Sequence, residues 1–250
     1  FEGQNITHLN NGSSDAKPVT LSFYVKSSIT GTFGVSLYKP ENTFRIINAT
    51  YTINSADTWE QKVITFDGDT SGGGIDNDNS EGMRVAWHLA SGSTYDSTNS
   101  TSWADYNNSN WAGGHAQDGV VTTTNATWQL TGVQLEVGST ATDFEHRSFG
   151  EELLACQRYL FKGDAQCLGS SDSAGNTSVA VQTPVNLRAN PTLVSFSSAL
   201  RGSMTATAAG AAFSAMVAPR VTITVTNSGT ANTLVAGFGG SCSVHLDSEL

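Results

Sequence analysis

The amino-acid sequence predicts an all-β protein, built as an antiparallel sandwich or barrel. Two observations support this fold class. Apolar and polar residues alternate in short runs, as strands with one buried face require, and turn-forming residues separate these runs. The connections between the runs are also too short and too polar for the crossover helices that parallel strands need.

Six runs predict the strands of a first domain. They cover residues 19–28, 32–39, 44–53, 59–66, 83–90 and 127–138. The first two, joined by "SSITG", predict a β-hairpin. The alternation predicts that these strands bury Leu21, Phe23, Val25, Phe33, Val35, Leu37, Leu130, Val133, Leu135 and three tryptophans, Trp59, Trp87 and Trp128.

One short helix interrupts the β pattern near residues 149–162. Ser148 is a plausible N-cap, and Glu151 follows it at the spacing of a capping box. Leu153 and Leu160 lie on the apolar face and are expected to be buried, and Gly163 is a suitable stop. Because about ten residues form no stable helix alone, packing must hold this helix in place.

The charge of the chain is unevenly distributed. Residues 1–160 contain 18 acidic and 8 basic residues, whereas residues 161–250 contain four of each, for a net charge of −10. No basic stripe is present to neutralise phosphates, so nucleic acid is not expected as a partner. No apolar run is long enough to span a bilayer, so membrane insertion is not expected either.

Three consecutive motifs carry a resemblance to a known family. They are "GVQLEVG" at Gly132–Gly138, "ATDFEHR" at Ala141–Arg147 and "ELLACQRY" at Glu152–Tyr159. Upstream, "FEGQNI", "TLSFYVKSSITGTFGVSL" and "HLASGSTY" follow in the family's order. Over residues 1–160 the chain resembles bacteriophage tail-fibre and minor virion proteins with a carbohydrate-binding-module-like jelly roll.

This resemblance implies a domain organisation. It gives an antiparallel jelly-roll β-sandwich at residues 1–147, followed by a linking helix at 148–163. The β-type runs at residues 178–198 and 220–246 predict a second, smaller β domain at 164–250. The family's jelly rolls carry a strand or more before "FEGQNI". The resemblance therefore implies that a partner segment supplies the first strand or that Phe1 is not the natural start.

The resemblance also implies a function. It suggests a non-enzymatic virion protein, assembled in the host cytoplasm, that binds host-surface glycan or attaches other virion proteins. Phage fibres of this kind are commonly homotrimers, so self-association is expected. The alternatives are a module of a polysaccharide-degrading tailspike and a capsid decoration protein. The residues themselves favour a non-enzyme, because the chain has scattered histidines and no Gly-x-Ser-x-Gly or His-Glu-x-x-His motif.

A polar stretch from Ser91 to about Val120 breaks the alternation and is the candidate binding loop. Structureless loops of this length are uncommon unless they serve a function. Flat aromatic faces for stacking on sugar rings stand here among amides and carboxylates that can bond hydroxyls. The candidate glycan-binding residues are Tyr95, Trp103, Asp105, Tyr106, Asn107 and Trp111. The alternative is that the aromatic residues are plugs that hold the loop against the core.

The acidic turn "DGDTSGGGIDND" is a candidate calcium site. Asp67, Asp69 and Asp78 fall at positions 1, 3 and 12 of a calcium-loop pattern, with Gly72 at position 6. Position 12 is Asp rather than Glu, and no helices flank the loop. The alternative is a solvated acidic turn with no bound cation.

Overall fold

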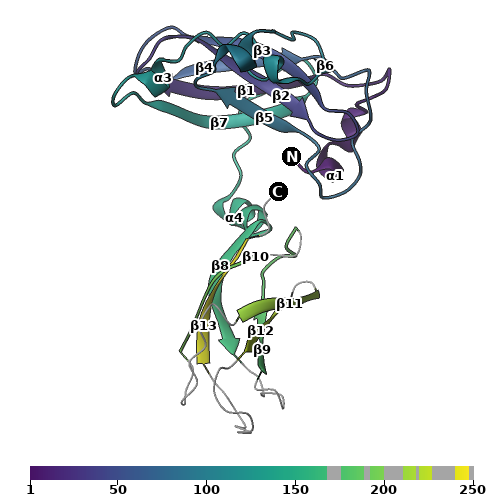
Figure 1. The fold of residues 1–250 in the computed structure, drawn as a ribbon, viewed down its shortest axis with the longest axis vertical. Helices are drawn as coiled ribbons and strands as arrows, with labels where there is room; N and C mark the ends of the chain where they lie inside the picture. Colours follow the sequence, from purple (N-terminus) through teal and green to yellow (C-terminus); the bar gives the residue numbers. More distant parts are fainter. Residues whose placement is uncertain (168–175, 189–191, 200–210, 218–219, 227–239, 248–250) are drawn as a thin grey trace. The chain divides into compact units, whose positions relative to one another are not determined.

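The chain divides into two compact units, Phe1–His146 and Arg147–Leu250. The structure, a computed structural model, describes residues 1–167, 176–188, 192–199, 211–217, 220–226 and 240–247 (Figure 1). Side chains are described for residues 1–163 and 183–188. The two units are presented separately below.

The first unit is an antiparallel β-sandwich (Figure 1). One sheet has the order β4-β1-β7 and consists of β1 (Val19–Ser27), β4 (Glu60–Phe66) and β7 (Trp128–Val137). The other has the order β5-β2-β3-β6 and consists of β2 (Gly31–Lys39), β3 (Arg45–Ile53), β5 (Arg84–His88) and β6 (Ala104–Asp105). The predicted all-β fold and its six long strands are therefore confirmed.

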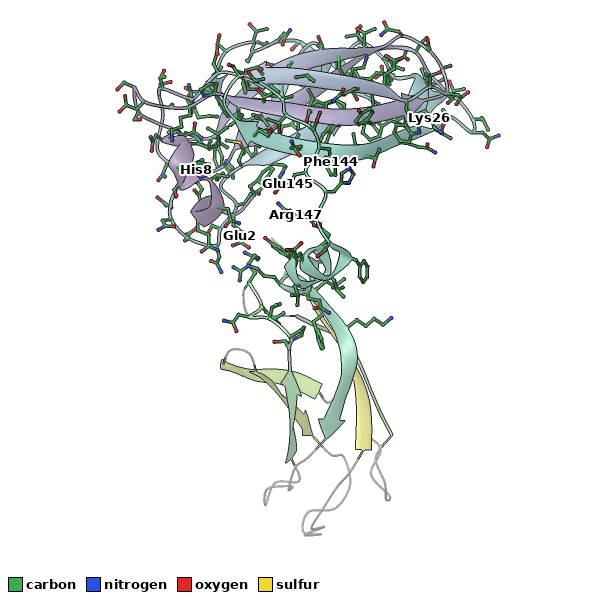
Figure 2. The ribbon with its side chains drawn as sticks, turned by 180° about the vertical axis from the view of Figure 1, so that it is seen from behind. Glu2, His8, Lys26, Phe144, Glu145 and Arg147 are labelled. Carbon is green, nitrogen blue, oxygen red and sulfur yellow. The ribbon has the colours of Figure 1, made fainter. Side chains whose placement is uncertain are left out.

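Short helical turns complete the first unit. They are α1 (Gly3–Ile6), η1 (Thr7–Leu9), α2 (Ser93–Asp96), η2 (Asn108–Asn110) and α3 (Gly119–Thr122). Figure 2 shows Glu2 and His8 at one end of the sandwich and Lys26 at the other. The first residues pair with the segment before β5, where the Phe1 amino group donates to the Met83 carbonyl at 2.7 Å.

The hydrophobic core lies between the two sheets. Phe23 of β1 is fully buried and meets Tyr51 of β3 edge-on, with ring centroids 5.2 Å apart. It meets Trp87 of β5 in the same way at 5.7 Å. Trp128, Leu130 and Leu135 of β7, the neighbour of β1 in its sheet, also pack against the core, as predicted from their alternation.

Three sequence expectations about the sandwich are wrong. The β1 and β2 strands form no hairpin, because β1 pairs with β4 and β7 whereas β2 pairs with β3 and β5. Val133 is exposed, since a bulge at Gly132, whose φ is +57°, interrupts the alternation of β7. Trp59 is also exposed, and Lys26 lies over its ring at 5.4 Å.

A buried ion cluster closes one end of the core. Lys39 and Arg45 lie directly opposite each other on β2 and β3. Two positive charges in this position repel each other unless an anion lies between them. Asp69 provides the anion, with Oδ2 2.8 Å from Lys39 Nζ and Oδ1 3.1 Å from Arg45 Nη2. Burial alone would raise the pKa of Asp69, but the hydrogen bonds from Arg45 and Lys39 outweigh it and lower the pKa.

The second unit begins with α4 (Phe149–Gln157). Ser148 caps it, and the reciprocal bonds between Ser148 and Glu151 form the predicted capping box. The helix is shorter than the predicted linking helix of residues 148–163, because β8 (Leu160–Cys167) begins where its last turn was expected. Leu153 and Leu160 are exposed in the single chain, which does not bury them as predicted.

Two further antiparallel sheets make up the described part of the second unit. One has the order β10-β13-β8 and adds β10 (Thr192–Ala199) and β13 (Gly240–Asp247). The other has the order β11-β12-β9 and consists of β9 (Asn176–Gln182), β11 (Ala211–Val217) and β12 (Arg220–Thr226). Within the described ranges, no helix of either unit has the length and apolar character of a membrane span.

Candidate functional site

The polar stretch from Ser91 to Asp118 covers the outer face of the four-stranded sheet. Asn48 of β3 is the main anchor. Its backbone amide donates to the Ser100 carbonyl at 2.7 Å, and its Oδ1 accepts from the Ser100 amide at 2.9 Å. Its Nδ2 donates to the Asn110 carbonyl at 3.0 Å. The long loop is therefore a docked layer held by buried hydrogen bonds.

A buried serine and histidine lie under the same segment. Ser36 Oγ is 2.8 Å from His88 Nε2 and 3.0 Å from the Trp111 carbonyl. Burial, with a smaller contribution from the neighbouring His115, lowers the pKa of His88 to about 4. Because Ser36 is fully buried, no substrate can reach its hydroxyl, and the pair acts as part of the anchor.

His115 fixes the last turn of the covering segment. Its Nδ1 accepts from the Gly34 amide at 3.2 Å, and its Nε2 lies 3.2 Å from Asp118 Oδ1. A Cβ atom on Gly34 would stand only 3.2 Å from the His115 Cβ, so glycine allows this close approach. The segment is thus held at its last turn as well as in the middle.

An aromatic cluster lies where this segment meets the end of β2. The Trp111 ring meets Tyr38 and Tyr106 edge-on, with centroids 5.5 Å and 5.9 Å away. Tyr38 also lies edge-on to Tyr106 at 5.2 Å and parallel to Phe44 at 6.4 Å. Phe44 is 60 % exposed and the other three rings are half-buried, so the cluster offers accessible ring surface. We call Tyr38, Phe44, Tyr106 and Trp111 the aromatic cluster.

Polar groups border the aromatic cluster. Arg84 lies 5.8 Å from the Tyr38 ring centroid and forms a two-bond pair with Glu81. The Tyr106 hydroxyl lies 3.3 Å from Asn108 Oδ1. Burial, and next the neighbouring Tyr106, raises the pKa of Tyr38. Its hydroxyl is protonated at neutral pH, as in an ordinary tyrosine, and can donate a hydrogen bond.

The six predicted glycan-binding residues separate into two groups. Tyr106 and Trp111 lie together in the aromatic cluster, and Tyr95 is exposed on α2. Three are occupied by structural contacts. Trp103 packs against the core and donates from Nε1 to the Asp67 carbonyl at 2.6 Å. Asp105 pairs with Arg45 at 2.7 Å, and Asn107 caps η2.

Replacing Trp103 with alanine should lower the melting temperature of the sandwich, because the ring fills space against the core and its N–H is satisfied. Large-to-small core changes of this kind cost about 3–5 kcal/mol when the site is fully buried, and this half-buried ring should lose less. Thermal unfolding measures the change. An unaltered melting temperature would contradict the plug role.

The three acidic residues of the predicted calcium site do not come together. Asp69 is buried and forms ion pairs with Lys39 and Arg45, whereas Asp67 and Asp78 are exposed. Asp78 instead bonds the Ser80 amide within its own turn. In the part of the chain that is described, no three His, Cys, Asp or Glu side chains are grouped to hold a metal ion.

Sequence reasoning missed Tyr38, Phe44 and Arg84, although a signal was present. Tyr38 falls out of phase with Phe33, Val35 and Leu37, so it lies on the outward face of β2. An aromatic residue at an outward strand position adds exposed apolar surface of the kind that marks binding sites. A comparison with protein-family models and with curated proteins found no match to this chain.

Proposed function

We propose that the chain is a non-enzymatic bacteriophage virion protein, from a tail fibre or a related appendage, that binds a glycan on the host surface. The observation that supports binding is the aromatic cluster on the sandwich. The motifs of residues 132–159 support the phage assignment, by resemblance.

The chemistry of the aromatic cluster suits a sugar ring. Phe44 offers an open flat face, on which the apolar C–H side of a pyranose can stack. Tyr38 contributes a protonated hydroxyl, and Asn108 an amide close to Tyr106. Sugar hydroxyls need such donors and acceptors at the edge of the stacking face. The guanidinium of Arg84 is paired with Glu81, so the cluster presents no unbalanced cation.

Self-association and attachment to other virion proteins belong to the same proposal. The α4 helix exposes Phe149, Leu153 and Leu154 in the single chain. Apolar side chains grouped on a short helix gain free energy when a partner covers them. A homotrimer that joins copies through this helix supports the avidity that a fibre needs for weak sugar ligands.

The proposal predicts that Phe44→Ala weakens glycan binding by at least about tenfold, roughly 1.4 kcal/mol. The lost ring face cannot be replaced by hydroxyl contacts, and the melting temperature should stay close to that of the wild type, since the ring is exposed. Retention of the purified chain on immobilised bacterial surface polysaccharide measures the binding. Tyr106→Ala should act in the same direction.

Val121→Ala is the control, since it removes an apolar side chain from an exposed position on α3 that belongs neither to the aromatic cluster nor to α4. It should bind like the wild type. Equal retention of Phe44→Ala and wild type would contradict the aromatic cluster as a glycan site. New reducing ends in the polysaccharide would instead favour the tailspike alternative.

A further inference from the structure

The two outer faces of the sandwich differ. Residues 91–118 cover the four-stranded sheet, whereas the outer face of the three-stranded sheet β4-β1-β7 carries several exposed side chains. Outward residues of β1 alternate as Thr20, Ser22, Tyr24 and Lys26, opposite to the core residues Leu21, Phe23 and Val25. Thr20 and Ser22 are covered, and Tyr24 and Lys26 are accessible. This outer face is called the open face below.

The open face carries aromatic rings at separated positions. Tyr24 is 39 % exposed in the middle of β1, and Trp59 is 45 % exposed just before β4. Tyr24 pairs with Gln61, so Trp59 lies one strand across and two residues along from Tyr24. Strand geometry puts their Cα atoms about 8 Å apart. Two rings at this separation can stack on different sugars of one chain.

A third ring joins them through the bulge of β7. Gly132 has a left-handed φ of +57°, and a Cβ atom there would lie 3.2 Å from the Tyr24 ring and 3.9 Å from the Phe144 ring. Glycine therefore leaves the space in which the two rings flank the strand. Gln134 bonds the 142–145 segment through Asp143 O and the Glu145 amide, which keeps Phe144 beside β7 (Figure 2).

Neutral hydrogen-bonding groups lie between the rings, together with the exposed apolar side chain of Val63 opposite Ser22. Gln61, Gln129 and Thr131 are exposed next to Tyr24 and Lys26 in the register of the sheet. Lys26 is the basic residue here, and it lies over the Trp59 ring. At the other end, Thr142 donates to Glu136. With a net charge of −10 for the chain, a polyanion would be repelled.

We propose that the open face is a second carbohydrate-binding surface, which takes an unbranched neutral polysaccharide. Rings spaced by amides and hydroxyls match a polymer whose apolar ring faces alternate with hydroxyl edges. A protein partner would favour a continuous apolar centre. Here the polar residues Gln61 and Thr131 lie directly opposite Tyr24 on the two neighbouring strands. The open face lies across the core from the aromatic cluster, so the two surfaces can be tested separately.

Affinity gel electrophoresis of the full chain tests this proposal. The gels contain soluble β-1,4-glucan, β-1,4-mannan or β-1,4-xylan, with polygalacturonate as the anionic comparison. At least one neutral polymer should retard the wild type, and polygalacturonate should not. Tyr24→Ala and Trp59→Ala should each weaken retardation about tenfold or more, with melting temperatures close to the wild type. Tyr24→Phe and Trp59→Phe keep a ring and should retain most of the binding.

Phe44→Ala separates the two surfaces. If Phe44→Ala keeps the retardation that Tyr24→Ala and Trp59→Ala lose, the open face is the binding surface for that polymer. Loss in Phe44→Ala alone would leave the proposed function standing and overturn the second surface. Retardation of the wild type by none of the three neutral polymers, or equal retardation of wild type and both alanine variants, would also overturn it.

Discussion

Replacing Asp69 with alanine should lower the free energy of unfolding of the sandwich by about 3–5 kcal/mol. The change leaves the Lys39 ammonium and the Arg45 guanidinium facing each other at the end of the core without their shared anion. An unpaired buried charge costs more than the ion pair itself contributes. Urea unfolding followed by tryptophan fluorescence measures the effect, because all five tryptophans lie in residues 1–146.

Asp105 supplies the matched control for Asp69. It also pairs with Arg45, at 2.7 Å, but its side chain is 88 % exposed. Solvent screens such a contact, so Asp105→Ala should cost no more than about 1 kcal/mol. If the two variants lost equal stability, the burial of Asp69 would not be what makes its ion pairs important.

Acidification should destabilise the sandwich between about pH 6.5 and pH 4. In the folded chain the pKa of His88 is about 4, because burial and the nearby His115 disfavour its charged form. In the unfolded chain it returns to about 6.5. The unfolded state therefore takes up a proton first as the pH falls. By about pH 4 the loss reaches about 3 kcal/mol from this residue.

Unfolding free energies measured across this pH range test the role of His88. His88→Gln removes the titrating ring and should flatten the pH dependence between pH 6.5 and 4. His8→Gln, at an exposed residue near the N-terminus, should leave the pH dependence in place (Figure 2). An unchanged slope in His88→Gln would assign the acid sensitivity to other groups.

Strand positions could be predicted from the sequence, but strand partners could not. The alternation in residues 19–28 and 32–39 reports that each run has one buried face, and both runs are strands. It does not report which sheet receives the strand, so the turn "SSITG" looked like a hairpin although it connects the two layers. Val133 shows a related limit, since a single bulge at Gly132 changes the phase of the strand.

The candidate site was only half predictable for a similar reason. Tyr106 and Trp111 are recognisable because they lie in a polar stretch, whereas Tyr38 and Phe44 lie in or beside strands, where the pattern does not distinguish them from ordinary strand residues. The predicted calcium site is wrong because contacts with distant parts of the chain decide what Asp69 binds. The spacing of Asp67, Asp69 and Asp78 is local, but the partners of Asp69 come from β2 and β3.

In residues 91–118, different side chains determine the backbone path and the exposed surface. Asn48 of β3 and the buried Asn110 and His115 of the segment itself fix its path, through bonds that its outward side chains do not share. Substitutions at exposed positions such as Tyr95 or Asn108 can therefore accumulate without redirecting the chain. A layer built in this way can diversify what it presents to its surroundings while the strands beneath it keep their sequence.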